Sequence, residues 1–499
     1  MDRRTFLKSL GAVGALSLGG ILTGCKDQLT GASTSLEQLP SGPPADGIPK
    51  LTHGEIQLVA RPTRWELAPG KVVTAWGYNG QVPGPEIRVR EREQVRVVLT
   101  NELPELTTIH WHGINVPNAM DGVPFVTQEP VPSGGQFIYE FIAKPAGTRW
   151  YHTHFNEKDQ LEKGLYAPFI IEPSNSQQYD REFTLALDDW NTGASPSVSS
   201  GNSGMGGMMG EMMSHMMGGQ MGNMMGGQTP NYDTYTISGK AWPATQPLLV
   251  HKGERVKLRL INASATETHT IHLAGHALKV THTDGNALAN PEEADAVRLA
   301  PAERVDVKFF ADNPDIWELR CLDGDHAQRG MKTVLQYEGF SKSARSRPAM
   351  DRALRVWSYA NQSQGMMSMN MSSVMTLVGA DGKFSLTLSG GMMMNPDVWT
   401  INGRTYPNTE PLWVKQGDRV RVKLFNMSME SHPMHLHGHT FRVLSINGQP
   451  SELLKDTVNV GHMETVEIEF DADNPGNWFF HCHKPMHMEG GMISLVKYR

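Results

Sequence analysis

The sequence has few of the features that mark several common protein classes. It contains three cysteines in 499 residues, too few for a disulfide scaffold. Its net charge is −7, so it lacks the surplus of Lys and Arg that a nucleic-acid-binding protein normally carries. The apolar run from Ser9 to Gly24 is too short and too rich in glycine to span a bilayer as a stable helix. We therefore expect neither a disulfide-rich fold nor a nucleic-acid partner.

Methionine and histidine are abundant instead. The chain has 29 Met and 20 His, and both side chains can bind copper. With 39% hydrophobic and 19% charged residues it is globular, and its length suits about three domains of roughly 150 residues each. The 50 Gly and 31 Pro are many for a helical protein and favour an all-β fold with many turns.

The N-terminus has the pattern of an export signal. Residues 2–8 (DRRTFLK) resemble a twin-arginine signal and precede the short apolar run, so we expect a signal over 1–25. Residues 22–25 (LTGC) resemble a lipobox, which predicts lipidation of Cys25; an ordinary cleavage site beside an incidental cysteine is the alternative. The polar stretch 26–48 is typical of a flexible tether. These features predict a periplasmic or envelope protein, exported by the twin-arginine route and anchored by lipid if Cys25 is modified.

A segment that alternates charged and apolar residues occurs three times, at 91–101, 252–262 and 416–426. A period of two is typical of a strand with one face in water. The asparagines that end the copies, Asn101, Asn262 and Asn426, are 161 and 164 residues apart, so the repeating unit is a whole domain.

A tryptophan-led strand closes each repeat, at Trp150, Trp317 and Trp478. Short strands and Gly/Pro turns predict three all-β Greek-key sandwiches, over 49–175, 176–345 and 346–499. In the middle repeat Cys321 aligns with Cys482 but lacks flanking histidines. We therefore expect the middle domain to be a copper-free relative of the other two.

Four histidine pairs of the form His-X-His divide equally between the first and third repeats. On a strand, residues i and i+2 point to the same face, so one pair can serve neighbouring metal ions. Eight buried core histidines would each need hydrogen-bond partners, which makes a purely structural role a poor explanation. The pairs are His110/His112, His152/His154, His435/His437 and His481/His483.

The C-terminal region adds a thiol, two more imidazoles and a thioether. These groups belong to Cys482, His432, His487 and Met492. Such a set is typical of a blue-copper electron-transfer site, in which a weak axial Met tunes the potential. Because Cys482 lies between His481 and His483, a short covalent path would join this site to copper ions bound by those histidines.

Three motifs resemble those of the three-domain multicopper oxidases, over roughly residues 50–499: 110–113 (HWHG), 432–439 (HPMHLHGH) and 481–492 (HCHKPMHMEGGM). The resemblance implies cupredoxin-like domains and four copper ions. It implies a type 1 copper on His432, Cys482, His487 and Met492, and a type 2 copper on His110 and His435. It assigns the two type 3 coppers to His112, His152 and His483 and to His154, His437 and His481. The trinuclear cluster would lie between the first and third domains.

In this family four one-electron oxidations at type 1 copper are coupled to reduction of dioxygen to two waters. The reaction consumes protons, and Asp121, eleven residues after His110, lies where relatives carry an acid. A turn-forming role before Gly122 is the alternative. Many bacterial relatives have a glutamate directly after the equivalent of His487; this chain has Met488, with Glu489 one place later.

The segment 201–227 contains ten Met and ten Gly. Soft thioether ligands suit Cu(I), and so many glycines make a helix marginal; packing, a lid or a spacer are the alternatives. A second group, within 366–394, comprises Met366, Met367, Met369, Met371, Met375, Met392, Met393 and Met394. The candidate Cu(I) ligands of the first are Met205, Met208, Met209, Met212, Met213, Met216, Met217, Met221, Met224 and Met225.

The methionines favour a cuprous oxidase, which converts Cu(I) to Cu(II) and serves copper tolerance, with dioxygen as the acceptor. A laccase-like oxidase of phenols and aromatic amines is the alternative with the same coppers. A copper store without catalysis, or a copper-free scaffold on the same fold, is the third hypothesis; the intact ligand set argues against the scaffold. The domain count is compatible with a monomer.

Overall fold

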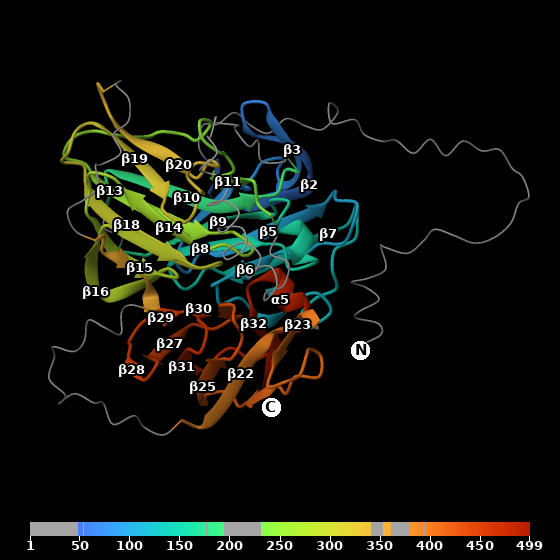
Figure 1. Cartoon of the computed structure of the whole chain (residues 1–499). Helices are drawn as coiled ribbons and strands as arrows, with labels where there is room; N and C mark the ends of the chain where they lie inside the picture. Colours follow the sequence, from blue (N-terminus) through green and yellow to red (C-terminus); the bar gives the residue numbers. More distant parts are fainter. Residues whose placement is uncertain are drawn as a thin grey trace, which may run out of the picture.

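The computed structural model describes residues 48–52, 54–175, 178–193, 231–340, 353–360, 380–392 and 395–499. These residues form three consecutive domains, each with two β-sheets, coloured blue to teal, green to yellow and orange to red in Figure 1. The prediction of an all-β fold of three cupredoxin-like sandwiches is confirmed. The predicted signal, the segment 201–227 and most of 366–394 lie outside the described residues.

The first domain has a four-stranded sheet of order β3-β2-β5-β7 and a five-stranded sheet of order β1-β4-β9-β8-β6. Apolar residues of both sheets, such as Leu58, Val97 and Phe169, are buried between them in one core. The domain also holds a 3-10 turn, η2 (Asn118–Met120), and a short helix, α2 (Glu157–Gln160). Its strands are β1 (Lys50–Leu51), β2 (Glu55–Ala68), β3 (Lys71–Tyr78), β4 (Glu86–Arg90), β5 (Gln94–Asn101), β6 (His110–His112), β7 (Gln136–Ile142), β8 (Gly147–His152) and β9 (Tyr166–Glu172).

The second domain has two six-stranded sheets, of order β11-β10-β13-β18-β15-β16 and β12-β20-β19-β14-β17-β21. Its strands are β10 (Arg181–Trp190), β11 (Thr234–Ile237), β12 (Leu248–Val250), β13 (Arg255–Asn262), β14 (His269–Leu273), β15 (Leu278–Thr283), β16 (Asn286–Ala294), β17 (Ala296–Leu299), β18 (Arg304–Phe310), β19 (Ile316–Cys321), β20 (Lys332–Tyr337) and β21 (Val356–Trp357).

The third domain has one sheet of order β23-β22-β25-β31-β27-β28, with β29 also paired to β27, and a second of order β24-β33-β32-β26-β30. A short helix, α5 (Pro485–Glu489), follows β32. The strands are β22 (Gly382–Met392), β23 (Asn395–Ile401), β24 (Leu412–Val414), β25 (Arg419–Asn426), β26 (His432–Leu436), β27 (Phe441–Ile446), β28 (Gln449–Pro450), β29 (Leu454–Lys455), β30 (Thr457–Val460), β31 (Thr465–Asp471), β32 (Asn477–Cys482) and β33 (Ile493–Tyr498).

The three repeated segments occupy equivalent places. Strands β5, β13 and β25 each pair in parallel with the strand that comes first along the chain in the same sheet. These partners are β2, β10 and β22, respectively. Each ends in an asparagine whose side-chain amide donates to two backbone carbonyls; those of Asn426, for example, belong to Glu430 and Val460. Asn101 and Asn262 make the corresponding bonds in their own domains. The sequence repeat is therefore a repeat of structure down to single hydrogen bonds.

Charged side chains from all three domains meet in a buried cluster. The guanidinium of Arg304 in the second domain donates hydrogen bonds of 2.7 and 2.5 Å to the two carboxylate oxygens of Asp456 in the third. Arg149 of the first domain lies 3.6 Å from the same carboxylate. Burial opposes the ionisation of Asp456, but Arg304 and Arg149 hold its pKa below the usual range. Together with the neighbouring ion pair between Lys455 and Asp284, this cluster joins the three domains through buried charged side chains.

Candidate metal centre

One cluster within the third domain combines a thiol with two imidazoles. His432 opens β26, Cys482 ends β32, and His487 lies in α5. The Cys482 Sγ is 3.6 Å from His432 Nδ1 and 3.5 Å from His487 Nδ1, and the two nitrogens are 3.0 Å apart. All three residues are buried, so three soft or borderline ligand atoms converge on one point.

The far side of each imidazole in this cluster has its own partner. His432 Nε2 is 2.6 Å from the Ser428 hydroxyl, and His487 Nε2 is 3.2 Å from the Glu430 carboxylate. These contacts leave both Nδ1 atoms facing the sulfur, as metal ligands require. Burial raises the pKa of the Cys482 thiol to about 12, so a thiolate here needs a cation beside it.

Met492 is fully buried beside this cluster, and its backbone is tied to two of the cluster residues. The Cys482 N–H donates to the Met492 carbonyl at 3.1 Å, and the Met492 N–H donates to the His487 carbonyl at 3.0 Å. The turn after α5 therefore returns Met492 to the cluster core.

Eight further histidines meet between the first and third domains. Backbone pairing brings together the strands that carry them: β6 pairs with β8, so that His110 faces His152, and β26 pairs with β32, so that His435 faces His481. The Nε2 atoms of His110 and His435 are 3.3 Å apart across the domain boundary. The remaining close Nε2 pairs are His154 with His437 at 3.3 Å, His437 with His481 at 2.9 Å, and His152 with His483 at 3.3 Å.

Outer contacts set the orientation of most of these rings. For five of the eight, Nδ1 is within hydrogen-bond distance of an oxygen to which its N–H can donate, and His154 Nδ1 lies at ion-pair distance from a carboxylate; both leave the Nε2 lone pair for a metal. The partners are carbonyls of Asp121, Asp456, Thr153 and Cys482 for His110, His435, His152 and His481, and carboxylates of Asp121 and Glu157 for His437 and His154.

His112 is oriented the other way. Its Nε2 lies 3.1 Å from the Asp456 carboxylate and 3.2 Å from the Thr457 hydroxyl. Its buried Nδ1 has no hydrogen-bond partner among the described residues, and the same holds for His483 Nδ1. A buried polar nitrogen without a partner is costly, and a metal ion would supply the partner for His112.

Burial and mutual repulsion favour the neutral form of most of these imidazoles. Both effects lower the pKa values of seven of the eight, and that of His481 falls to about 3. Neutral imidazoles are the form that binds metals. The donor set and the orphaned nitrogen therefore both fit a group of copper ions.

Comparisons with known proteins agree with this geometry. Three family models described as multicopper oxidase match residues 60–176, 181–339 and 383–499. The multicopper oxidase MmcO of Mycobacterium tuberculosis is 32% identical over 88% of this chain and 86% of its own length. A copper resistance protein A homolog of Pseudomonas syringae pv. tomato is 26% identical over 99% of both chains. A multi-copper oxidase structure from Pseudomonas thermotolerans superposes with a TM-score of 0.67 at 29% identity, covering 90% of this chain and 100% of that one.

The chain belongs to the multicopper oxidase family. It is accordingly a copper-dependent oxidoreductase.

Asp121, the acid expected near the copper ions of this oxidase, lies between two of the histidines. Its carboxylate is 2.9 Å from His437 Nδ1 and 3.3 Å from His110 Nδ1. Asp121 is buried, and its Oδ1 has no hydrogen-bond partner among the described residues. The carboxylate thus contacts one ligand from each domain.

A second carboxylate, which the sequence did not reveal, lies on the other side of the oxidase's histidine group. Glu157 Oε1 is 3.1 Å from His154 Nδ1, and burial, with a contribution from Glu489, raises the pKa of Glu157 well above its usual range. Glu489 itself is exposed, and its carboxylate accepts a hydrogen bond of 3.2 Å from the Lys158 N–H. Glu157 lies three residues after His154, outside the His-X-His pairs from which the site was predicted.

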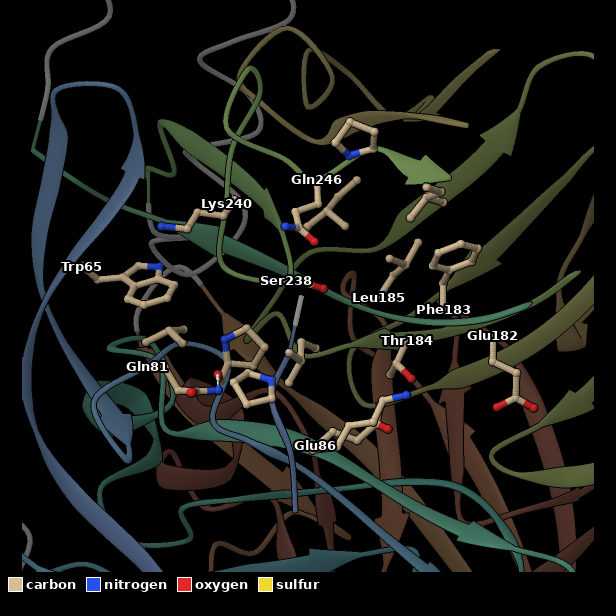
Figure 2. Close-up of a pocket in the computed structure, with 18 residues that line it drawn as sticks. Trp65, Gln81, Glu86, Glu182, Phe183, Thr184, Leu185, Ser238, Lys240 and Gln246 are labelled. Carbon is tan, nitrogen blue, oxygen red and sulfur yellow. Dashed lines mark hydrogen bonds between the residues drawn. The ribbon is translucent and has the colours of Figure 1, made fainter. Parts of the chain in front are cut away.

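Two cavities differ in their relation to the histidines. A cavity of about 60 Å³ is lined by His154, Phe479, Met488 and Glu489. A larger one of about 240 Å³ lies between the first two domains, where Figure 2 shows Trp65, Gln81, Glu86 and Glu182 around it. None of the expected copper ligands lines the larger cavity. The small cavity is the one that reaches the candidate centre.

The oxidase's middle domain, predicted to be copper-free, holds a group of buried ligand atoms. His269, Cys321 and His326 are buried, and their ligand atoms converge. That prediction rested on the residues that flank Cys321. The spacing of Cys321 to His326 and Met331 repeats the spacing of Cys482 to His487 and Met492.

Proposed function

We propose that this multicopper oxidase is a cuprous oxidase that couples oxidation of four Cu(I) to reduction of one dioxygen and four protons to two waters. Three features support the proposal. They are the two groups of buried residues that fit copper, the exposed thioethers beside the mononuclear cluster, and the methionine-rich segments. The choice of Cu(I) as the substrate rests on the exposed thioethers, because these residues lie in the described part of the chain.

The ligand assignment follows the geometry above. We assign the type 1 copper to His432, Cys482, His487 and Met492, and the type 2 copper to His110 and His435. We assign the type 3 pair to His112, His152 and His483 and to His154, His437 and His481, which makes four copper ions in the first and third domains. When bound, copper accepts and passes on single electrons and reduces dioxygen.

The chain itself links the two centres. Cys482 is a ligand of the first centre, and its sequence neighbours His481 and His483 belong to the second. The Cys482 carbonyl also accepts from His481 Nδ1 at 2.9 Å. An electron thus has both a covalent and a hydrogen-bonded route from the sulfur to the histidine group.

Protons have two candidate carriers. Asp121 contacts His110 and His437, and we assign it the delivery of protons to reduced oxygen. Glu157 lies on the opposite side, between His154 and the surface carboxylate of Glu489. The small cavity lined by His154 and Glu489 provides space for dioxygen to approach between them.

Exposed methionines lie at the edge of the mononuclear cluster. Met427, Met429 and Met463 are 57, 67 and 58% exposed. The loops that carry them are joined, since Met463 N–H donates to the Asn426 carbonyl and His462 Nδ1 lies 2.7 Å from the Ser428 carbonyl. Ser428 in turn contacts His432. We name these three residues the thioether patch, a surface suited to soft Cu(I) beside the electron acceptor.

The N-terminal pattern supports export to the periplasm by the twin-arginine route, with Cys25 as the point of lipid attachment. The described residues contain no helix long and apolar enough to cross a membrane. Oxidation of Cu(I) in that compartment would serve copper tolerance. The oxidase would act there as a monomer.

Deleting residues 201–227 tests the choice of substrate. We expect kcat/KM for Cu(I) to fall by about tenfold while that for a simple phenol is kept or raised, because the deletion removes soft thioether ligands that a phenol does not need. A matched variant keeps the length of the segment and replaces its ten methionines with serine, so that the loss of thioethers is separated from the shortening of the chain. Equal loss of both activities, or no change in either, would contradict a substrate-specific role; faster phenol turnover in the intact enzyme would favour a laccase.

A further inference from the structure

The middle domain contains a buried cluster with the composition of the mononuclear cluster in the third domain. Cys321 Sγ is 3.5 Å from His326 Nδ1 and 3.8 Å from His269 Nδ1, and the two nitrogens are 3.3 Å apart. The corresponding distances around Cys482 are 3.5, 3.6 and 3.0 Å. The two clusters therefore present the same three ligand atoms at nearly the same separations.

The chain reaches the two clusters in the same way. His326 and Met331 follow Cys321 by five and ten residues, as His487 and Met492 follow Cys482. The Cys321 N–H donates to the Met331 carbonyl at 3.1 Å, and the Met331 N–H donates to the His326 carbonyl at 2.9 Å. Met331 is fully buried, like Met492. The turn that returns a methionine to the cluster is thus repeated bond for bond.

The surroundings are repeated too. His269 Nε2 is 2.7 Å from the Ser264 hydroxyl, as His432 Nε2 is from Ser428 at 2.6 Å. An aromatic ring stacks on the last histidine of each cluster, Tyr235 on His326 and Trp399 on His487. These outer contacts hold the imidazoles so that Nδ1 faces the sulfur in both domains.

Each cluster also has a carboxylate behind one imidazole: Glu430 behind His487 in the third domain, and Asp189 behind His269 in the middle one. The carboxylate of buried Asp189, on β10, lies 3.1 Å from His269 Nε2. A carboxylate behind a ligating imidazole fixes its ring and raises its basicity. Neither carboxylate oxygen of Asp189 has a hydrogen-bond partner of good geometry among the described residues. A buried carboxylate at ion-pair distance from this imidazole suits a histidine that ligates a cation through its other nitrogen.

We infer that His269, Cys321, His326 and Met331 form a second mononuclear copper site, of the type 1 class, in the middle domain. A thiolate, two imidazoles and a thioether suit copper with a weak axial ligand. The residues that flank Cys321 are Arg320 and Leu322, so the site lacks the histidine bridge that Cys482 has. It therefore adds a copper ion outside the direct path from Cys482 to the histidine group. This inference does not depend on which substrate the oxidase uses.

The test compares the full-length, copper-loaded enzyme with three variants: Cys321→Ser, Cys482→Ser and the double variant. Copper per chain is measured by elemental analysis, and bound Cu(II) by visible absorption and electron paramagnetic resonance. We expect Cys321→Ser to lose one copper ion and about half of the thiolate absorption, and Cys482→Ser to stay blue through the middle site. The double variant should be colourless.

Two outcomes would overturn the inference. One is a Cys482→Ser variant without colour while Cys321→Ser keeps the full copper content; the other is zinc at the middle site of copper-exposed protein. Since Cys321→Ser removes a buried side chain, Met331→Leu serves as a second variant that preserves the core volume. It should raise the reduction potential of one blue component and leave the other unchanged, and an unchanged potential for both would also count against the site.

Discussion

At the scale of single residues, Asp121 is the clearest link between geometry and chemistry. Because its carboxylate contacts His437 and His110 without being placed as a ligand, Asp121→Asn should leave copper content intact. Reoxidation of the reduced enzyme by dioxygen should slow by about 100-fold, since the proton source is lost. Stopped-flow absorption measures this rate, with the exposed Asp180→Asn as a control. A full rate in Asp121→Asn would end its assignment as a proton donor.

Met492 allows a second residue-scale prediction. A weak axial thioether lowers the reduction potential of a type 1 copper, so Met492→Leu should keep the blue colour and raise the potential. The measurement is best made in the Cys321→Ser background, where one blue component remains. A redox titration that finds the same potential with and without the thioether would show that Met492 is not axial.

At the scale of elements, the thioether patch should matter for one substrate only. Replacing Met427, Met429 and Met463 by Leu keeps the size of the side chains and removes the soft sulfur ligands. We expect kcat/KM for Cu(I) to fall by three- to tenfold and that for a phenol to change little. Met120→Leu in the first domain is the matched control. A parallel fall for both substrates would point to a disturbed cluster instead of a lost substrate site.

Elements also show what could be predicted from the sequence and what could not. The His-X-His pairs lie on strands or at their ends, and period two identified them because it is local. The register of His110 with His152, and the meeting of His110 with His435, depend on pairing between distant segments, which no local pattern encodes. Glu157 is a different case, because it lies only three residues after His154 and its contact with that histidine is local.

The middle cluster was missed for a different reason. In the assignment that we propose, histidines beside the cysteine belong to the trinuclear cluster, whereas the mononuclear ligands lie five and ten residues beyond it. The absence of the former at Cys321 therefore says nothing about the latter. The spacing to His326 and Met331 was visible in the sequence and would have identified the cluster.

At the scale of the whole molecule, the buried charge cluster joins the domains to the metal centre. Asp456 accepts from Arg304 and also lies 3.1 Å from His112. Asp456→Asn should lower the free energy of unfolding by about 3–5 kcal/mol, because it leaves a buried guanidinium without its counter-charge. Calorimetry measures the loss. Asp180→Asn, which breaks an exposed pair with Arg255, should change the free energy of unfolding little, because solvent screens that pair. Similar losses in both variants would contradict a special role for the buried cluster.

The most direct test of the central claim is steady-state oxygen consumption by the copper-loaded enzyme with Cu(I) as the donor, beside a simple phenol at matched concentration. The rate with the Cys482→Ser variant is subtracted to remove spontaneous oxidation of Cu(I). The account predicts one dioxygen consumed per four Cu(I) and a much higher kcat/KM for Cu(I) than for the phenol. Faster phenol turnover without added copper, or no oxygen uptake with Cu(I), would contradict it.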